Sequence, residues 1–165
     1  MRILTRVSAV VVAFLSLNAG GASAQSANIN ATATVFQAIT VTGARDLAFG
    51  NVFPGVAKTV VVSDATSGRF DLTGQSSGNV NVSFTLPTNL TSGANNLPIG
   101  TWTGCTNATN TTTGCTSFTP SAGATASAFS GAGALFVWVG GTVSPAANQA
   151  AGAYTGIVTL TAAYF

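Results

Sequence analysis

Short runs of alternating apolar and polar residues follow one another from Gln25 to the end of the chain, and none has the period of an amphipathic helix. Gly, Asn, Ser and Pro separate the runs, which is typical of strands joined by turns. The predicted strands are residues 29–36, 38–42, 47–52, 59–63, 69–72, 80–86, 134–139 and 154–165. The predicted turns are residues 53–55, 76–79, 92–93 and 140–141. This pattern indicates an all-β fold, and more closely an antiparallel β-sandwich.

Strand patterning is weakest in residues 88–131, where Thr, Asn, Ser and Gly dominate, and we expect long loops there with one or two weak strands. It is strongest in residues 154–165, which contain no proline. One face of this predicted strand carries Tyr154, Gly156, Val158, Leu160, Ala162 and Tyr164. Chain ends usually fray, so a strand this regular at the end of a chain indicates that something holds it.

The first residues have the layout of a secretory signal peptide. A short basic region, MRILTR, precedes an apolar stretch over residues 7–17, and the small residues Ala22, Ser23 and Ala24 form a cleavage site. The apolar stretch is too short to span a bilayer comfortably. We therefore predict cleavage after Ala24, export from the cell and a mature chain that starts at Gln25.

Two of the five basic residues lie in the predicted signal peptide, so the mature chain has no net charge. The charged side chains that remain are Arg45, Asp46, Lys58, Asp64, Arg69 and Asp71. A basic face for nucleic acid is therefore excluded. The charged surface that normally keeps a free domain soluble is missing too, which favours a protein that packs against its own copies. An ordinary secreted domain of low charge is the alternative.

Titratable side chains for catalysis are few, since the chain has no His and no Glu. Nucleophile–base pairs of the Ser–His or Cys–His kind are therefore impossible. Asp46 follows Arg45 directly, which suggests a paired or solvated carboxylate and not a general acid. We expect no enzyme activity, no cofactor, no metal site and no small-molecule substrate.

Cys105 and Cys115 are the only cysteines, and thiols in an exported protein tend to oxidise. The polar, glycine-containing sequence between them is typical of a loop. We predict a disulfide that closes this loop as a local staple on a surface hairpin, stabilising the fold by roughly 2–3 kcal/mol.

Three aromatic residues raise the alternative of a carbohydrate site: Trp102, Trp138 and Tyr154. Trp138 lies in a run that is apolar on both strand faces, which core burial explains better. Trp102 is the one candidate for an exposed binding residue.

Residues 25–36 form a predicted N-terminal extension with the pattern of an amphipathic strand. Asn and Thr occupy one face, and the other face carries Ala27, Ile29, Ala31, Ala33 and Val35. A short break separates this segment from the next predicted strand. The alternative is that it forms an ordinary first strand of a self-sufficient sandwich.

Both ends of the chain resemble subunits of chaperone–usher pili. The closing segment is similar to their C-terminal motif, with Gly152 fourteenth from the end, an alternating apolar row and a penultimate tyrosine. In this chain the row is Tyr154, Val158, Leu160 and Ala162, and the tyrosine is Tyr164. Residues 25–36 resemble the donor strand of that family. Residues 46–52, with Leu47, Phe49 and Gly50, are similar to the L-x-F-G stretch of spore-coat-protein-U-like pilins, and residues 140–154 to their final hairpin.

The resemblance implies an immunoglobulin-like sandwich over residues 37–165 that lacks a strand, which the extension of a neighbouring subunit supplies. Such a donor contributes main-chain hydrogen bonds while its alternate side chains fill apolar pockets. It also implies a structural subunit of a bacterial surface fibre, with copies of itself or related pilins, a periplasmic chaperone and an outer-membrane usher as partners. The chaperone would bind the C-terminal strand in the periplasm before the subunit joins a fimbrium at the cell surface. The alternative is a self-contained secreted binding module of the adhesin or lectin kind.

Overall fold

The computed structural model describes residues 24–165, which divide into two units: residues 24–34 belong to the first, and Val35–Phe165 form the second. The predicted signal peptide therefore lies, apart from Ala24, outside the described residues. In the first unit, residues 24–34 are exposed and form neither helix nor strand. The strand predicted for residues 29–36 is thus wrong for this chain taken alone. Alternation supplies the faces of a strand, but only a paired neighbour supplies its ladder of hydrogen bonds.

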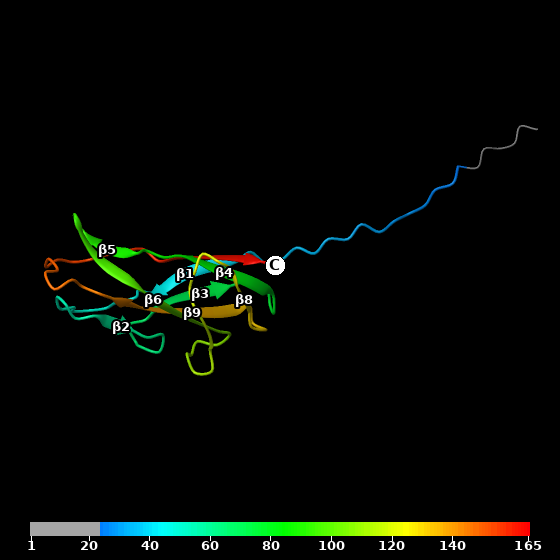
Figure 1. The fold of residues 1–165 in the computed structure, drawn as a ribbon. Helices are drawn as coiled ribbons and strands as arrows, with labels where there is room; N and C mark the ends of the chain where they lie inside the picture. The colour runs from blue at the N-terminus through cyan, green and yellow to red at the C-terminus, as the bar shows by residue number, and fades with distance from the viewer. Residues whose placement is uncertain (1–23) are drawn as a thin grey trace, which may run out of the picture. The chain divides into compact units, whose positions relative to one another are not determined.

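The second unit is an all-β, immunoglobulin-like sandwich of antiparallel sheets, as predicted (Figure 1). Its strands are β1 (Thr40–Arg45), β2 (Lys58–Val60), β3 (Gly68–Thr73), β4 (Asn79–Thr85), β5 (Asn89–Ser92), β6 (Asn95–Asn107), β7 (Thr116–Phe118), β8 (Thr125–Ala128), β9 (Ala134–Val143) and β10 (Thr159–Tyr164). The larger sheet has the order β1-β3-β9-β6-β5, with β2 beside β9 and β7 beside β6. The smaller sheet has the order β10-β4-β8. The described residues contain no helix long and apolar enough to cross a membrane.

The main core lies between the two sheets. β4 alternates strictly between buried and more exposed residues, so one of its faces points into the sandwich. The core combines residues of both sheets, namely Leu72, Val80, Val82, Phe84, Phe129, Leu135, Val137, Val139 and Leu160. Apolar side chains from facing sheets bury one another here, as a sandwich requires.

A second, smaller cluster contains no residue of the smaller sheet. It consists of Phe49, Val60, Leu97, Ile99 and Val143, which come from β2, β6, β9 and the loop after β1. In Figure 1 β2 and β5 lie at the end of the sandwich away from the C-terminus. In this part of the molecule the larger sheet therefore continues without a strand of the smaller sheet opposite it.

The prediction for residues 88–131 is wrong. Residues 88–131, expected to be mainly loops, contain β5, β6, β7 and β8, and the 13 residues of β6 make it the longest strand. A register shift between Gly100 and Thr103, with Thr101 at a φ of 46°, interrupts the alternation of β6, and this hides the strand from pattern analysis.

The predicted turn at residues 140–141 is also wrong, because both glycines lie inside β9. A Cβ atom on Gly140 would collide with the carbonyl oxygen of Val60, and one on Gly141 would lie 3.2 Å from the Trp102 ring. These glycines therefore permit close approach of neighbouring segments and do not reverse the chain. Residues 47–52 form no strand either, since the chain turns there and Gly50 has a φ of 62°.

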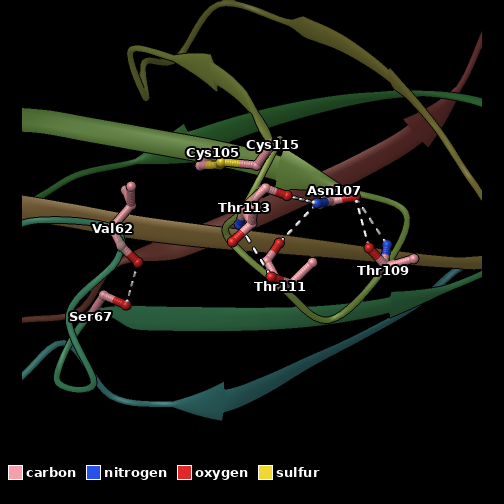
Figure 2. Close-up of a disulfide and its surroundings, with 8 residues drawn as sticks. All are labelled: Val62, Ser67, Cys105, Asn107, Thr109, Thr111, Thr113 and Cys115. Atoms are coloured by element: carbon pink, nitrogen blue, oxygen red, sulfur yellow. Dashed lines mark hydrogen bonds between the residues drawn. A yellow bond between two sulfur atoms is a disulfide. The ribbon is translucent and has the colours of Figure 1, made fainter.

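The predicted disulfide staple is confirmed. Cys105 in β6 joins Cys115, which precedes β7, with Cα atoms 5.8 Å apart (Figure 2). The Asn107 side chain organises the enclosed loop: its Nδ2 donates to the carbonyl oxygens of Thr111 and Thr113, and its Oδ1 accepts from Thr109.

The two tryptophans are both parts of the packed structure. Trp138 is buried, and it lies opposite Cys105 and Arg69 in the sheet register. Trp102 is half-buried and packs against both hydrophobic clusters. Core burial of Trp138 is thus confirmed, whereas Trp102 is partly exposed.

Candidate functional site

A groove of about 1030 Å³ lies over the second cluster, where the larger sheet has no strand opposite it. The end of β1 and residues 46–54 form one wall, and residues 149–156 with Val158 form the other. Its apolar lining includes Phe49, Phe70, Leu90, Leu97, Ile99, Val139 and Val143. Phe70 and Leu90 are partly exposed, and the other five side chains are at most 9% exposed, so the groove shows only a limited apolar surface.

Pro87 accounts for the place where the smaller sheet stops. β10 pairs with β4 from Tyr164 opposite Val80 to Thr159 opposite Thr85. Two residues further along the same register, Ile157 would face Pro87, which has no amide to donate. The ladder therefore ends at Thr159, and the chain before it continues beside the groove without β4.

The backbone of residues 156–158 has no hydrogen-bond partner among the described residues. Just before it, Thr155 forms an isolated bridge with Thr91 of β5, with N–O distances of 2.8 and 3.0 Å. Ile157 is 80% exposed, although it is apolar and β-branched. The strand predicted for residues 154–165 is thus correct only for 159–164. Residues 156–158 have the sequence of a strand but lack a neighbour to pair with, and Thr155 is paired only through its isolated bridge.

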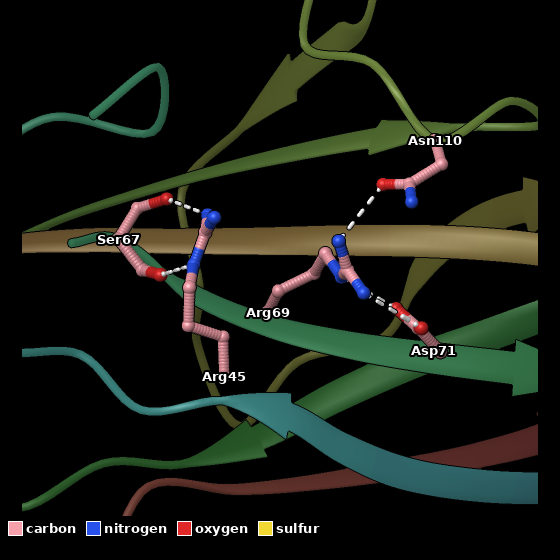
Figure 3. A network of polar contacts seen from close by, with 5 residues as sticks. All are labelled: Arg45, Ser67, Arg69, Asp71 and Asn110. Atoms are coloured by element: carbon pink, nitrogen blue, oxygen red, sulfur yellow. Dashed lines mark hydrogen bonds and ion pairs between the residues drawn. The ribbon is translucent and has the colours of Figure 1, made fainter. Parts of the chain in front are cut away.

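Two charged residues line the groove: Asp46 is exposed, and Arg45 is held by local structure. Arg45 at the end of β1 donates from Nε to the Ser67 carbonyl oxygen at 2.6 Å, and from Nη2 to Ser67 Oγ at 2.7 Å (Figure 3). Ser67 is fully buried and donates in turn to the carbonyl oxygen of Val62 at 3.0 Å. These bonds hold the guanidinium at the turn before β3.

A second charged cluster, also shown in Figure 3, joins β3 to the disulfide loop. Arg69 pairs with Asp71 through N–O distances of 2.8 and 3.0 Å and donates to Asn110 Oδ1 at 3.0 Å. This arrangement ties the disulfide loop to β3, which is a structural role. The described residues contain no group of three His, Cys, Asp or Glu side chains that could hold a metal ion.

The structure divides the predicted C-terminal motif between two environments. Leu160, Ala162 and Tyr164 lie in β10 and pack in the main core. Gly152, Tyr154 and Val158 line the groove. The hydroxyl of Tyr154 accepts from Gln149 Nε2 at 2.7 Å and donates to the carbonyl oxygen of Ala150 at 2.8 Å, which braces this wall.

The predicted donor-strand residues are all exposed. Ala27, Ile29, Ala31 and Ala33 lie in the first unit, and Ile29 is 93% exposed. Val35 begins the second unit and is 90% exposed. Their apolar face is therefore available to a binding partner.

Several residues of the groove lie where no strand was predicted from the sequence. Leu90, Leu97 and Ile99 lie in the region expected to be mainly loops, although the predicted turn at residues 92–93 marks the hairpin that carries them. Pro87 directly follows a predicted strand, and this was the available signal for the end of pairing.

The geometry defines an immunoglobulin-like β-sandwich with one open, apolar half. Residues 39–164 match a family described as a domain of unknown function (DUF4402), and the chain belongs to that family. No curated protein and no solved structure matches the chain.

Proposed function

We propose that this protein is a structural subunit of a bacterial surface fibre, which polymerises when the N-terminal extension of one copy enters the groove of the next. The observation that carries the proposal is the unpaired backbone of residues 156–158 beside the groove. A strand placed there would supply the missing main-chain hydrogen bonds and cover the apolar lining at the same time.

The extension has the properties that this groove requires. Its apolar face is exposed and includes the large side chains of Ile29 and Val35, which would be the deeper anchors. Ala31 and Ala33 between them would need only shallow pockets. The extension carries no charged side chain, so placing its side chains against the groove would bury no unpaired ion.

The ends of β10 support a head-to-tail contact. The groove adjoins the start of β10 at Val158, whereas Gln37, through which the chain joins the domain, is hydrogen-bonded to Tyr164 at the other end. A contact between unlike surfaces that does not close on itself generates a filament.

The partners follow from the same groove. An open apolar edge aggregates unless it is covered, so a periplasmic chaperone would occupy it before assembly and an outer-membrane usher would receive the subunit. The protein would accordingly pass through the inner membrane and the periplasm and end in a fimbrium at the cell surface.

A self-contained binding module is the second candidate, and the size of the groove favours it. Its volume is close to the upper end of the range for small-molecule sites, about 300–1,000 Å³. In that case the extension would have no part in completing the fold.

Thermal unfolding of two forms separates these candidates. One form is the chain from Gln25; the other lacks residues 25–34 at the front and carries residues 25–36 after Phe165 through a long flexible linker. If the extension completes the sandwich, the relocated form is a monomer that melts well above the plain form, and the plain form is unstable or oligomeric. A plain form that melts cooperatively as a monomer at the same temperature would refute the fibre assignment.

Ile29→Asp in the relocated extension is the matched test of the apolar anchor. Burying an unpaired carboxylate in an apolar groove costs several kcal/mol, so this variant should lose the gain in melting temperature. Asn30→Asp places the same charge on the polar face and should keep most of the gain. Equal losses from both substitutions would mean that the alternation of the extension does not determine its binding.

A further inference from the structure

Tyr164 closes a ring of hydrogen bonds that joins three separate parts of the chain. Its hydroxyl accepts from the backbone N–H of Gln75 at 2.6 Å and donates to the carbonyl oxygen of Gln37 at 2.7 Å. The backbone N–H of Gln37 donates to Oε1 of Gln75 at 3.3 Å, which completes the ring. The end of β10, the turn between β3 and β4 and the segment leading into β1 are thereby held together.

The ring of Tyr164 is enclosed on several sides. Phe36 meets it edge to face with ring centroids 5.2 Å apart, and Phe129 lies 6.0 Å away. A Cβ atom on Gly74 would lie 2.6 Å from the Tyr164 hydroxyl oxygen, and one on Gly78 would lie 3.2 Å from the ring. The two glycines thus leave the room that this side chain occupies.

We propose that Tyr164 is a positioning residue that fixes the point at which the N-terminal extension leaves the domain. Phe36 and Gln37 are held by the contacts just described, whereas Val35 is 90% exposed. The segment that a second copy can take up therefore ends at Val35.

The consequence for a fibre rests on the proposed function. β10 would have the extension of one neighbour beside its first residue and the root of its own extension bound to Tyr164. Tension along the fibre would then reach β10 through the hydrogen bonds of Tyr164 and β1 through the covalent backbone.

Proteolysis by chymotrypsin tests the positioning role, because this enzyme cleaves after Phe36 once the backbone there is released. The chain from Gln25 should carry Ile29→Asp throughout, which keeps the extension out of the groove of any second copy. Tyr164→Phe removes the hydroxyl and keeps the ring, and we expect it to raise the cleavage rate after Phe36 about tenfold. Mass spectrometry of the fragments identifies the cleaved bond.

Tyr154→Phe is the matched control. Its hydroxyl also makes two hydrogen bonds, with Gln149 and Ala150, but at the groove wall and away from Gln37. This variant should leave the cleavage rate after Phe36 unchanged. Urea unfolding of both variants would show whether a change in global stability accounts for the difference.

Equal cleavage rates after Phe36 in the two variants, at similar global stability, would overturn the inference. Gln75→Ala provides a second test, since it removes the acceptor for the Gln37 N–H and keeps the Gln75 backbone; we expect a smaller, roughly threefold increase. The relocated extension could fail to stabilise the domain while Tyr164→Phe still releases Phe36. In that case the fibre proposal fails, and the positioning role of Tyr164 stands.

Discussion

The two halves of the sandwich are built from the same larger sheet but differ in what covers it. In the closed half β4 and β10 lie opposite β3 and β9, and the side chains between them are almost completely buried. In the open half β2, β5 and the first part of β6 continue the sheet, and only irregular segments and a groove lie over the second cluster. Apolar patterning is present in both halves. The halves therefore differ in whether paired strands cover the larger sheet, and not in their hydrophobicity.

A leucine-to-alanine substitution should reduce the free energy of unfolding more in the closed half than in the open half. Leu135 in the closed half is 1% exposed and Leu97 in the open half is 5% exposed. We expect Leu135→Ala to reduce the free energy of unfolding by about 3–4 kcal/mol, because tight packing leaves a cavity. Leu97→Ala should cost about 2 kcal/mol, since the loops around the groove can move into the space.

Urea unfolding of both variants in the chain from Gln25 measures this difference. A loss for Leu97→Ala as large as that for Leu135→Ala would mean that the open half is packed as firmly as the closed half in solution, and the comparison would fail.

A proline in the unpaired segment before β10, residues 156–158, tests whether the backbone of this segment binds the extension. The amide of Ile157 has no partner among the described residues, so Ile157→Pro should change the stability of the plain chain by less than about 0.5 kcal/mol. In the form with the relocated extension the same amide would lie in the added ladder. Its loss, together with the clash of the proline ring, should then remove about 1–2 kcal/mol of the gained stability.

Ile157→Thr is the control for this substitution, because threonine keeps both the amide and the β-branched shape. Ile157 is 80% exposed and is not among the residues lining the groove, so this variant should leave both forms unchanged. If proline and threonine have equal effects in the relocated form, the backbone of this segment takes no part in binding the extension.

Several parts of the fold could be predicted from the sequence because their alternation coincides with pairing. β4 and β10 alternate, pair over six positions and bury one face, so pattern and structure agree. β6 was missed because its bulge and its many Thr and Asn residues conceal a central strand whose neighbours are distant in the sequence. The opposite disagreement occurs in residues 29–36 and 154–158, where the sequence alternates like a strand but the structure has no ladder of paired residues.

The two segments that have a strand pattern and no ladder, residues 29–36 and 156–158, are the two that the proposed contact would join. Disagreement between local pattern and the fold of a single chain is expected where function depends on a second molecule. The groove itself could not be predicted residue by residue, because its lining comes from β1, β3, β5, β6, β9 and two loops.

Replacing Pro87 should have the smallest effect on the free energy of unfolding. It tests whether this proline is the reason that the smaller sheet stops before the open half. Pro87→Ala restores an amide opposite Ile157, so the β4–β10 ladder can extend toward the groove. We expect the plain chain to gain about 0.5 kcal/mol from this extra pairing, within the usual range for one hydrogen bond. The relocated form should gain less, because the edge of residues 156–158 would then be shared with β4.

Comparing the melting temperatures of the two forms, each with and without the substitution, measures this difference in gain. A proline that merely stiffens the loop would instead destabilise both forms equally when replaced, because the unfolded chain would gain the same freedom in each.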